Sequence, residues 1–177
     1  MRLLGIFLLS IIFCVPPSAA HARQYTQTAF APSPEATDLI VRTIESAKTS
    51  VNVAAYYFTS EPIADALVKT HKRGVEVKVL LDRSQEKRQY AAIEELREAG
   101  IPVRINRHYA IMHNKYIVVD SKTVKTGSFN YTASAEKRNA ENVIVIRNNP
   151  TLAAKYLRNW KKLWDEGEEY NGQEGAK

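Results

Sequence analysis

Three ionisable side chains flank a short apolar run in the stretch MHNKYIVVDSKTVKTGSFNYT, residues 112–132. The run YIVV has the composition of a buried strand, yet His113 and Lys115 open the segment and Asp120 closes it. Side chains two residues apart share one face of an extended strand, so His113 and Lys115 project to the same side. An imidazole beside a fixed positive charge is a pair suited to an anion.

A second group of polar side chains follows the glycine at position 127. A turn at Gly127 can place Ser128 and Asn130 beside the histidine and lysine if the two segments are neighbours in a sheet. The combined set offers a nucleophile or base, a positive charge and two neutral hydrogen-bonding groups, which suits phosphoryl chemistry. The pair H-x-K alone carries little information, whereas six residues at fixed spacing form a specific signature.

The elements that must position these residues alternate between strands and helices. Apolar spacing, N-caps and glycine stop signals predict helices over residues 33–47, 60–74, 89–100 and 150–167. Alternating or β-branched runs predict strands over residues 26–32, 50–58, 75–81, 101–105 and 141–147, with a hairpin of residues 115–120 and 123–127. This alternation predicts an α/β fold with a mixed, largely parallel β-sheet sandwiched between helices.

The first 22 residues have the order of a secretory signal peptide. Arg2 precedes an apolar run of about 13 residues, and Ala20-His21-Ala22 fits a cleavage site. The run is shorter than the about 20 residues that span a bilayer. We expect cleavage after Ala22, with Ala20 as the alternative. The exported protein would be periplasmic or secreted, without stable membrane insertion.

Residues 23–177 have the length of one domain, with a loose polar tail from about residue 168. Cys14 is the only cysteine, so the domain after cleavage cannot form a disulfide. Removing Arg2 from 25 Lys and Arg leaves 24 against 19 Asp and Glu, a net charge of +5. This surplus favours a polyanion or an anionic membrane surface as partner, or serves solubility alone.

The string formed by His113, Lys115, Asp120, Gly127, Ser128 and Asn130 resembles the H-K-D signature of the phospholipase D superfamily, with its G-S-x-N extension. The stretches SVNVAAYYFTS, ALVKTHKRGVEVKVLLD and ENVIVI are similar, in the expected order, to the superfamily's small bacterial secreted endonucleases. These have one motif per chain. The resemblance covers most of residues 33–165 and implies the phospholipase D/nuclease-like fold.

The resemblance implies a role for each signature residue. His113 would attack phosphorus and form a covalent phosphohistidine. Lys115 and Asn130 would hold the non-bridging oxygens, and Ser128 would support them by hydrogen bonding. Glu141 matches the acid that bonds the other imidazole nitrogen and fixes its tautomer.

Three further residues complete the candidate site. Asp120 belongs to the signature and so to the candidate catalytic set, although strand alternation points it away from His113 and favours a structural or interface role. His108 and Tyr131 are candidate substrate-binding residues, at the site mouth and as a stacking surface for bases. For both, structural packing is the alternative. No metal or cofactor is implied, because residues 23–177 contain three histidines, no cysteine and no metal-binding string.

One motif supplies one histidine, whereas departure of an alkoxide calls for a general acid. The resemblance therefore implies a homodimer, in which two copies of His113, Lys115 and Asn130 meet across the two-fold axis. One histidine would attack while the other, protonated, serves the leaving oxygen.

Three functions are compatible with this sequence. The residues favour a metal-independent endonuclease that cleaves DNA, with RNA as a further substrate, without sequence specificity. A phospholipase D-type lipid phosphodiesterase is the first alternative, although no apolar interfacial loop is evident. A non-catalytic nucleic-acid-binding module is the second, and the intact set of site residues argues against it.

Overall fold

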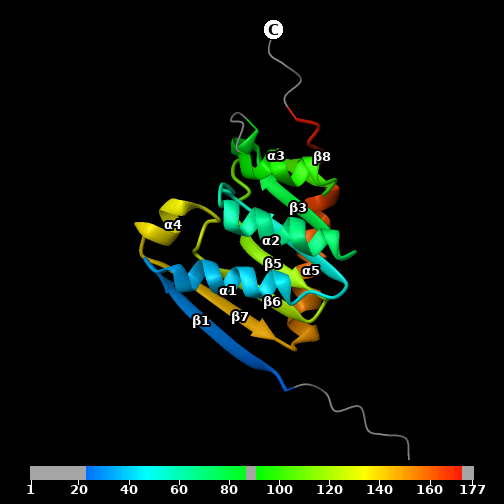
Figure 1. Ribbon diagram of the computed structural model, residues 1–177. Coiled ribbons are helices and arrows are strands. Elements are labelled where there is room, and N and C mark those ends of the chain that lie inside the picture. Colours follow the sequence, from blue (N-terminus) through cyan, green and yellow to red (C-terminus); the bar gives the residue numbers. More distant parts are fainter. Residues whose placement is uncertain (1–22, 87–90, 173–177) are drawn as a thin grey trace, which may run out of the picture.

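The computed structural model describes residues 23–86 and 91–172, which form one eight-stranded β-sheet with helices on both faces (Figure 1). The strands are ordered β1-β7-β6-β5-β2-β3-β4-β8 across the sheet. Their bounds are β1 Tyr25–Ala31, β2 Ser50–Ala55, β3 Glu76–Asp82, β4 Val103–Asn106, β5 Lys115–Val119, β6 Thr123–Gly127, β7 Glu141–Arg147 and β8 Glu168–Glu169. The first strand therefore pairs with the seventh, and the second lies beside the fifth.

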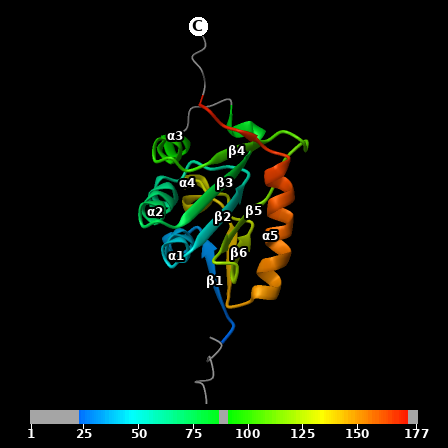
Figure 2. The ribbon, with the colours of Figure 1, turned by 90° about the vertical axis from the view of Figure 1, so that its right-hand side faces the viewer.

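Helices α1, α2 and α3 lie on one face of the sheet, and α5 runs along the opposite face (Figure 2). The bounds are α1 Pro34–Glu45, α2 Glu61–Lys72, α3 Ala91–Glu98, α4 Ala133–Lys137 and α5 Pro150–Asp165, with a 3-10 turn η1 Arg83–Gln85. The predicted start of α1 is confirmed, because the hydroxyl of Ser33 accepts from Glu35 N at 3.2 Å. Asn149 caps α5 in the same way through Leu152 N at 2.9 Å.

The predicted mixed sheet is confirmed, but its parallel part is smaller than expected. Among the described strands, β2 with β3 and β3 with β4 are the parallel pairs. The other five pairs are antiparallel. The carboxyl ends of β2 and β6 consequently lie beside the amino ends of β5 and β7, all at the same end of the strands.

The hairpin of β5 and β6 is confirmed, with its turn centred on Asp120 and Ser121. Both residues have positive φ angles, 50° and 53°, as the central positions of a type I′ turn require. Lys122 N closes the turn by donating to Val119 O at 3.1 Å. The turn sets the register of the two strands and so the relative position of the two halves of the motif.

The sheet has a core on each face. The larger core buries aliphatic side chains of α1, α2, α3 and the central strands, including Ile40, Leu67 and Val79. On the other face, Trp160 of α5 is buried and its indole N–H donates to Val53 O at 2.9 Å. Burying an aromatic side chain of this size stabilises the fold by about 1.5–3 kcal/mol. Trp160 therefore fixes α5 against β2.

The segment from Glu168, predicted to be a loose tail, instead joins the sheet. Glu168 and Glu169 form β8, which pairs with β4 and covers that edge. Tyr170 is buried, and its hydroxyl donates to Glu94 at 3.0 Å. The aromatic residue within the polar tail is the reason for this attachment.

Some sequence predictions fall on residues that the structure does not describe. The predicted signal peptide covers residues 1–22, the end of the predicted tail covers residues 173–177, and one predicted helix starts within residues 87–90. Within the described part of the chain, no helix combines the length and the apolar character that crossing a bilayer requires.

Candidate active site

The two halves of the motif meet at the end of the sheet where β6 ends and β5 begins. His113 lies two residues before β5, and Lys115 is the first residue of that strand. Ser128 and Asn130 follow directly after β6, which runs antiparallel to β5. The hairpin therefore brings these four residues to one end of two adjacent strands, as the sequence predicted.

A hollow of about 360 Å³ opens beside the histidine. Its wall comes from the start of β5, the end of β6 and the middle of α5. The lining residues are His113, Asn114, Lys115, Tyr116, Thr126, Gly127, Lys155, Tyr156 and Asn159. His113 is exposed, so a ligand in the hollow can reach its imidazole. The volume is within the roughly 300–1,000 Å³ usual for ligand sites.

Tyr56, directly after β2, contacts both the histidine and the lysine. Its ring centroid lies 4.6 Å from that of His113, and Lys115 Nζ lies 5.1 Å from the same centroid. The Tyr56 hydroxyl donates to the Tyr57 hydroxyl at 3.3 Å. This bond, together with burial and the nearby charges, raises the pKa of Tyr56 to about 12. The phenol therefore stays neutral while its ring orients two side chains of the site. Sequence reasoning did not select this tyrosine.

Lys115 is buried, with 8% of its surface exposed, and its Nζ donates to His113 O at 2.8 Å. Burial lowers the pKa of Lys115, and the negative charge of Glu141 opposes that effect. A cation withdrawn from water interacts more strongly with a nearby negative charge. Lys115 is thus held beside the histidine in an environment that favours an anionic ligand.

The turn after β6 supplies the neutral hydrogen-bonding groups. Ser128 Oγ accepts from Asn142 N at 3.0 Å and from Asn142 Nδ2 at 3.2 Å, which secures the turn to β7. Asn130 Oδ1 is buried and has no hydrogen-bond partner among the described residues. Such an atom is uncommon in a native protein unless water or a ligand satisfies it. Gly127 has a φ of 137°, and a Cβ there would collide with the Asn142 carbonyl, so only glycine fits.

Glu141 does not make the predicted hydrogen bond to the imidazole. It begins β7, and β6 separates it from β5. Its carboxylate accepts from Asn139 Nδ2 at 3.2 Å, and no hydrogen bond among the described residues joins it to His113. Its contribution to the site in this structure is the charge that acts on Lys115.

Asp120 lies at the far end of β5 and is not part of the catalytic group. Its carboxylate accepts from the backbone nitrogens of Lys48, Thr49 and Ser50 at 2.8–3.1 Å. Burial raises the pKa of Asp120, but these bonds, with one from the Thr49 hydroxyl, outweigh it and leave the pKa below its ordinary value. Asp120 ties the loop before β2 to the hairpin turn. This is the structural role that strand alternation favoured, and its place in the catalytic set is corrected.

Tyr131 is fully buried and cannot stack on a base. Its ring meets that of Phe58 edge-on at 6.0 Å. Its backbone N donates to Tyr57 O at 3.0 Å, and its carbonyl accepts from Thr59 N at 2.8 Å. Tyr131 joins the loop after β2 to the turn after β6, so the prediction that it binds substrate is wrong.

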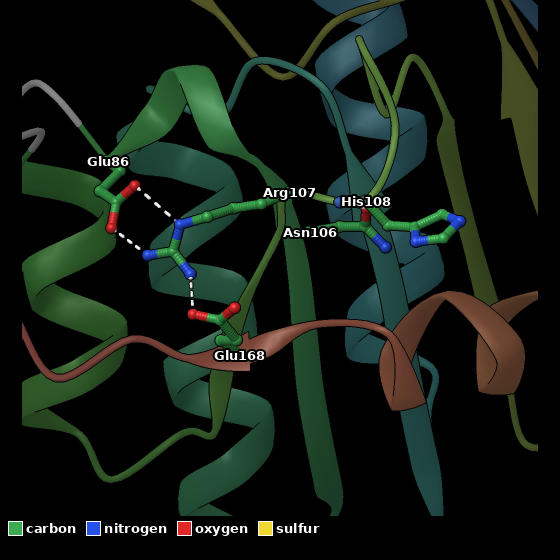
Figure 3. Close-up of polar contacts among 5 residues, drawn as sticks. All are labelled: Glu86, Asn106, Arg107, His108 and Glu168. Carbon is green, nitrogen blue, oxygen red and sulfur yellow. Dashed lines mark hydrogen bonds and ion pairs between the residues drawn. The ribbon is translucent and has the colours of Figure 1, made fainter.

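His108 is exposed on the loop after β4 and does not line the hollow. Figure 3 shows its ring pointing away from Arg107, which binds Glu86 and Glu168. Two strands, β3 and β2, lie between β4 and β5. Both histidines lie on the loop that joins β4 to β5, and at about 4.8 Å per strand the two ends of that loop are roughly 14 Å apart. The structure therefore does not bring His108 to His113.

Two buried ionisable residues support the site and were missed in the sequence. Lys125 of β6 is fully buried, and its Nζ donates to Lys115 O and contacts the Tyr131 hydroxyl, each at 3.3 Å. Burial, and after it the charge of Lys115, lower the pKa of Lys125 well below its ordinary value. Asp82, at the end of β3, accepts from Met112 N at 2.7 Å and so fixes the residue before His113.

This arrangement can bind and attack a phosphorus atom. The accessible imidazole is a nucleophile, and the desolvated ammonium can stabilise charge on the phosphate oxygens. At one edge of a mixed sheet between helix layers, these groups define a phosphodiesterase.

Comparison with known proteins assigns the family. The family model described as "Cardiolipin synthase, PLD-like domain" matches residues 40–164. A phospholipase D of Rickettsia bellii is 44% identical over 151 residues, covering 82% of this chain and 75% of that one. A mitochondrial cardiolipin hydrolase of Mus musculus is 32% identical over 127 residues, covering 72% of this chain and 57% of that one. The chain belongs to the phospholipase D family.

Solved structures agree with this assignment. The phospholipase D family member Nuc from Salmonella typhimurium has a TM-score of 0.80 and 40% identity, over 84% of this chain and 99% of that one. NucT from Helicobacter pylori has a TM-score of 0.76 at 22% identity and supports the fold alone. The α/β fold and the assignment as a phosphodiesterase of the phospholipase D superfamily are thereby confirmed.

Proposed function

We propose that this phosphodiesterase is an endonuclease that cleaves DNA, and also RNA, without a metal and without sequence specificity. The chemistry of the hollow carries the proposal. Of its nine lining residues none is aliphatic, and Lys115 and Lys155 are cations. A site for a lipid needs an apolar surface for acyl chains, whereas a nucleic-acid strand needs cations for its phosphates. The net charge of +5 for residues 23–177, 24 basic against 19 acidic residues, agrees with a polyanionic substrate.

The proposed reaction has two displacements. His113 attacks the phosphorus, so that a P–N bond forms while the bond to the leaving oxygen breaks. Water then attacks the phosphohistidine and releases the imidazole. The ammonium of Lys115 and the amide nitrogen of Asn130 stabilise the charge that develops on the non-bridging oxygens. The burial of Lys115 supports this role, because it strengthens the interaction with that charge.

We infer that a homodimer supplies the second imidazole. No other histidine lines the hollow that the described residues form. Apolar surface lies close to the site: Ile111, two residues before the catalytic histidine, is 53% exposed, and Tyr57 is 37% exposed. A second copy of the chain would cover these side chains. Its protonated His113 would donate to the leaving oxygen while the first His113 attacks.

Hydrolysis of a phospholipid is the second candidate. Relatives are named phospholipase D and mitochondrial cardiolipin hydrolase. The exposed Ile111 could contact a lipid surface. On this alternative, the apolar side chains near the site face a membrane instead of a second copy.

Cleavage of plasmid DNA in excess EDTA tests the proposed function. We expect the protein to nick the plasmid and His113→Asn to be slower by about 10³-fold or more, because no other group replaces the nucleophile. His108→Asn is the matched control and should keep its activity, because His108 is exposed outside the hollow. Loss of cleavage in EDTA would overturn metal independence. Hydrolysis of cardiolipin vesicles without cleavage of DNA or RNA would overturn the nuclease assignment in favour of the lipid.

A further inference from the structure

The hollow beside the histidine extends beyond the groups that the proposed mechanism uses. Its far wall comes from the middle of α5, where Lys155, Tyr156 and Asn159 line it. α5 lies along the face of the sheet opposite α1, α2 and α3 (Figure 2). None of these three residues belongs to the motif, and no chemistry at the scissile phosphate requires them.

Two of the three side chains in this wall, Tyr156 and Asn159, are held by contacts with Tyr116 of β5. The hydroxyl of Tyr116 donates to Asn159 Oδ1 at 2.8 Å. The rings of Tyr116 and Tyr156 meet edge-on, with centroids 5.0 Å apart and an interplanar angle of 80°. Because Tyr116 directly follows Lys115, α5 is fastened to the strand that carries the catalytic lysine. Side chains held in this way can position a ligand relative to His113.

The wall offers donors and positive charge. The Oδ1 of Asn159 is already engaged, so its amide nitrogen is the group left for a ligand, as a donor. Lys155 is exposed and forms no ion pair among the described residues. The helix contains no acidic residue before Asp165. By contrast, Lys161 pairs with Asp165 at 2.6 Å on the same helix.

We propose that Lys155 and Asn159 bind the phosphate next to the scissile one in a nucleic-acid strand. The inference rests on the proposed nuclease function and deepens it. A strand whose reacting phosphate lies at His113 carries its next negative charge one nucleotide away, and the shared hollow connects His113 to Lys155. Lys155 supplies the charge, Asn159 supplies a hydrogen bond, and Tyr156 contacts the intervening nucleotide. The subsite selects a polyanion over an isolated phosphodiester.

Salt dependence tests the role of Lys155. Each phosphate contact contributes about 0.7 to the slope of log K against log salt for a single strand and about 0.9 for a duplex. Lys155→Gln should reduce the magnitude of this slope by the amount that one phosphate contact contributes. The substitution should also raise the KM for an oligonucleotide. This fold increase should be at least about five times the fold increase in KM for bis(p-nitrophenyl) phosphate, which has no second phosphate. Lys161→Gln, with the same charge change on the same helix, is the control and should leave the slope within error of wild type.

A modified substrate tests which phosphate is bound. In an oligonucleotide with one cleavable linkage, a neutral methylphosphonate at the neighbouring position should weaken binding to the wild type. It should cause a clearly smaller loss in Lys155→Gln, because the ionic contact is already absent there and only the hydrogen bond from Asn159 remains to be weakened. If the methylphosphonate weakens binding equally in the wild type and in Lys155→Gln, the proposed subsite is overturned while nuclease activity stands. The same conclusion follows if Lys155→Gln and Lys161→Gln have equal salt slopes. Failure of the wild type to cleave any nucleic acid would overturn the subsite together with the proposed function.

Discussion

Lys125 lies fully buried beneath the site, although a lysine side chain is normally a solvated cation. Its Nζ holds the carbonyl of Lys115, and its distance to the centroid of the Tyr131 ring is 4.4 Å. Burial and the charge of Lys115 lower its pKa well below the ordinary value. The residue therefore links Lys115 to the turn after β6, at an electrostatic cost that depends on pH.

Replacing this lysine with methionine should expose that cost. The unfolded-state pKa is about 10.4 and the folded-state pKa is lower, so the unfolded chain binds more protons between the two values. Wild-type stability should therefore fall as pH falls from about 10.4, by up to about 1.4 kcal/mol per pH unit, relative to Lys125→Met. The lost hydrogen bonds add a constant penalty of about 1–3 kcal/mol. Urea unfolding at several pH values measures the difference.

Lys122→Met, in the exposed hairpin turn, is the control for this experiment and should show no such pH dependence. A difference between Lys125→Met and wild type that stays constant with pH would show that Lys125 is not held at a lowered pKa.

Residue spacing predicted the position of the site but not its buried supports. The spacing of His113, Lys115 and Asn130 carried the prediction, because two strand periods and one turn determine where these side chains lie. Lys125 and Tyr56 could not be identified as reliably, since their roles depend on what packs against them. Alternation within TVKTG does place Lys125 on the opposite side to Val124 and Thr126, which was the available signal.

The loop from β4 to β5 carries the histidine and is attached at both ends. At its start, Arg107 binds Glu86 and Glu168 on the surface (Figure 3). At its end, Asp82 is buried and accepts from Met112 N at 2.7 Å. The two attachments differ in exposure, so they should differ in strength.

Asp82→Asn should lower the free energy of unfolding by about 1–3 kcal/mol, because an amide can replace only one of its two acceptor oxygens. It should also lower kcat, since the residue before His113 loses its anchor. Arg107→Gln removes exposed ion pairs, so it should cost no more than about 1 kcal/mol and leave kcat unchanged. Thermal unfolding and steady-state kinetics test both variants. An equal loss of kcat in the two would show that Asp82 has no special role in positioning the loop.

The elements were predictable where local signals were strong. Ser33 and Pro150 marked helix starts, and the hairpin turn was found from two short runs of residues. The proportion of parallel pairs and the attachment of β8 depend on which strands become neighbours, and residues near in sequence do not determine this. Tyr170 was the local signal that the tail would be attached.

On the scale of the whole molecule, the proposed dimer should depend on the apolar surface beside the histidine. Ile111→Glu places a charge on a side chain that is 53% exposed. If the second copy covers it, the dimer should weaken by about 2 kcal/mol, or about 30-fold in Kd, with parallel loss of activity. Analytical ultracentrifugation over a range of concentrations measures the equilibrium.

Tyr25→Glu is the matched control for the dimer test. Tyr25 is 50% exposed but begins β1 at the end of that strand away from the site edge. The dimer should tolerate this change. A wild-type protein that is monomeric and fully active would overturn the dimer and leave the leaving group without the proposed acid.

The pairing of β1 with β7 also has a consequence for how the protein is made. Tyr25 is opposite Arg147 in the sheet, and the hollow needs Lys155 and Asn159 from the helix that follows. A ribosome must therefore synthesise most of the chain before the first strand finds its partner. Nascent chains shorter than this lack a complete site, so we expect each chain to stay inactive until its synthesis is nearly finished.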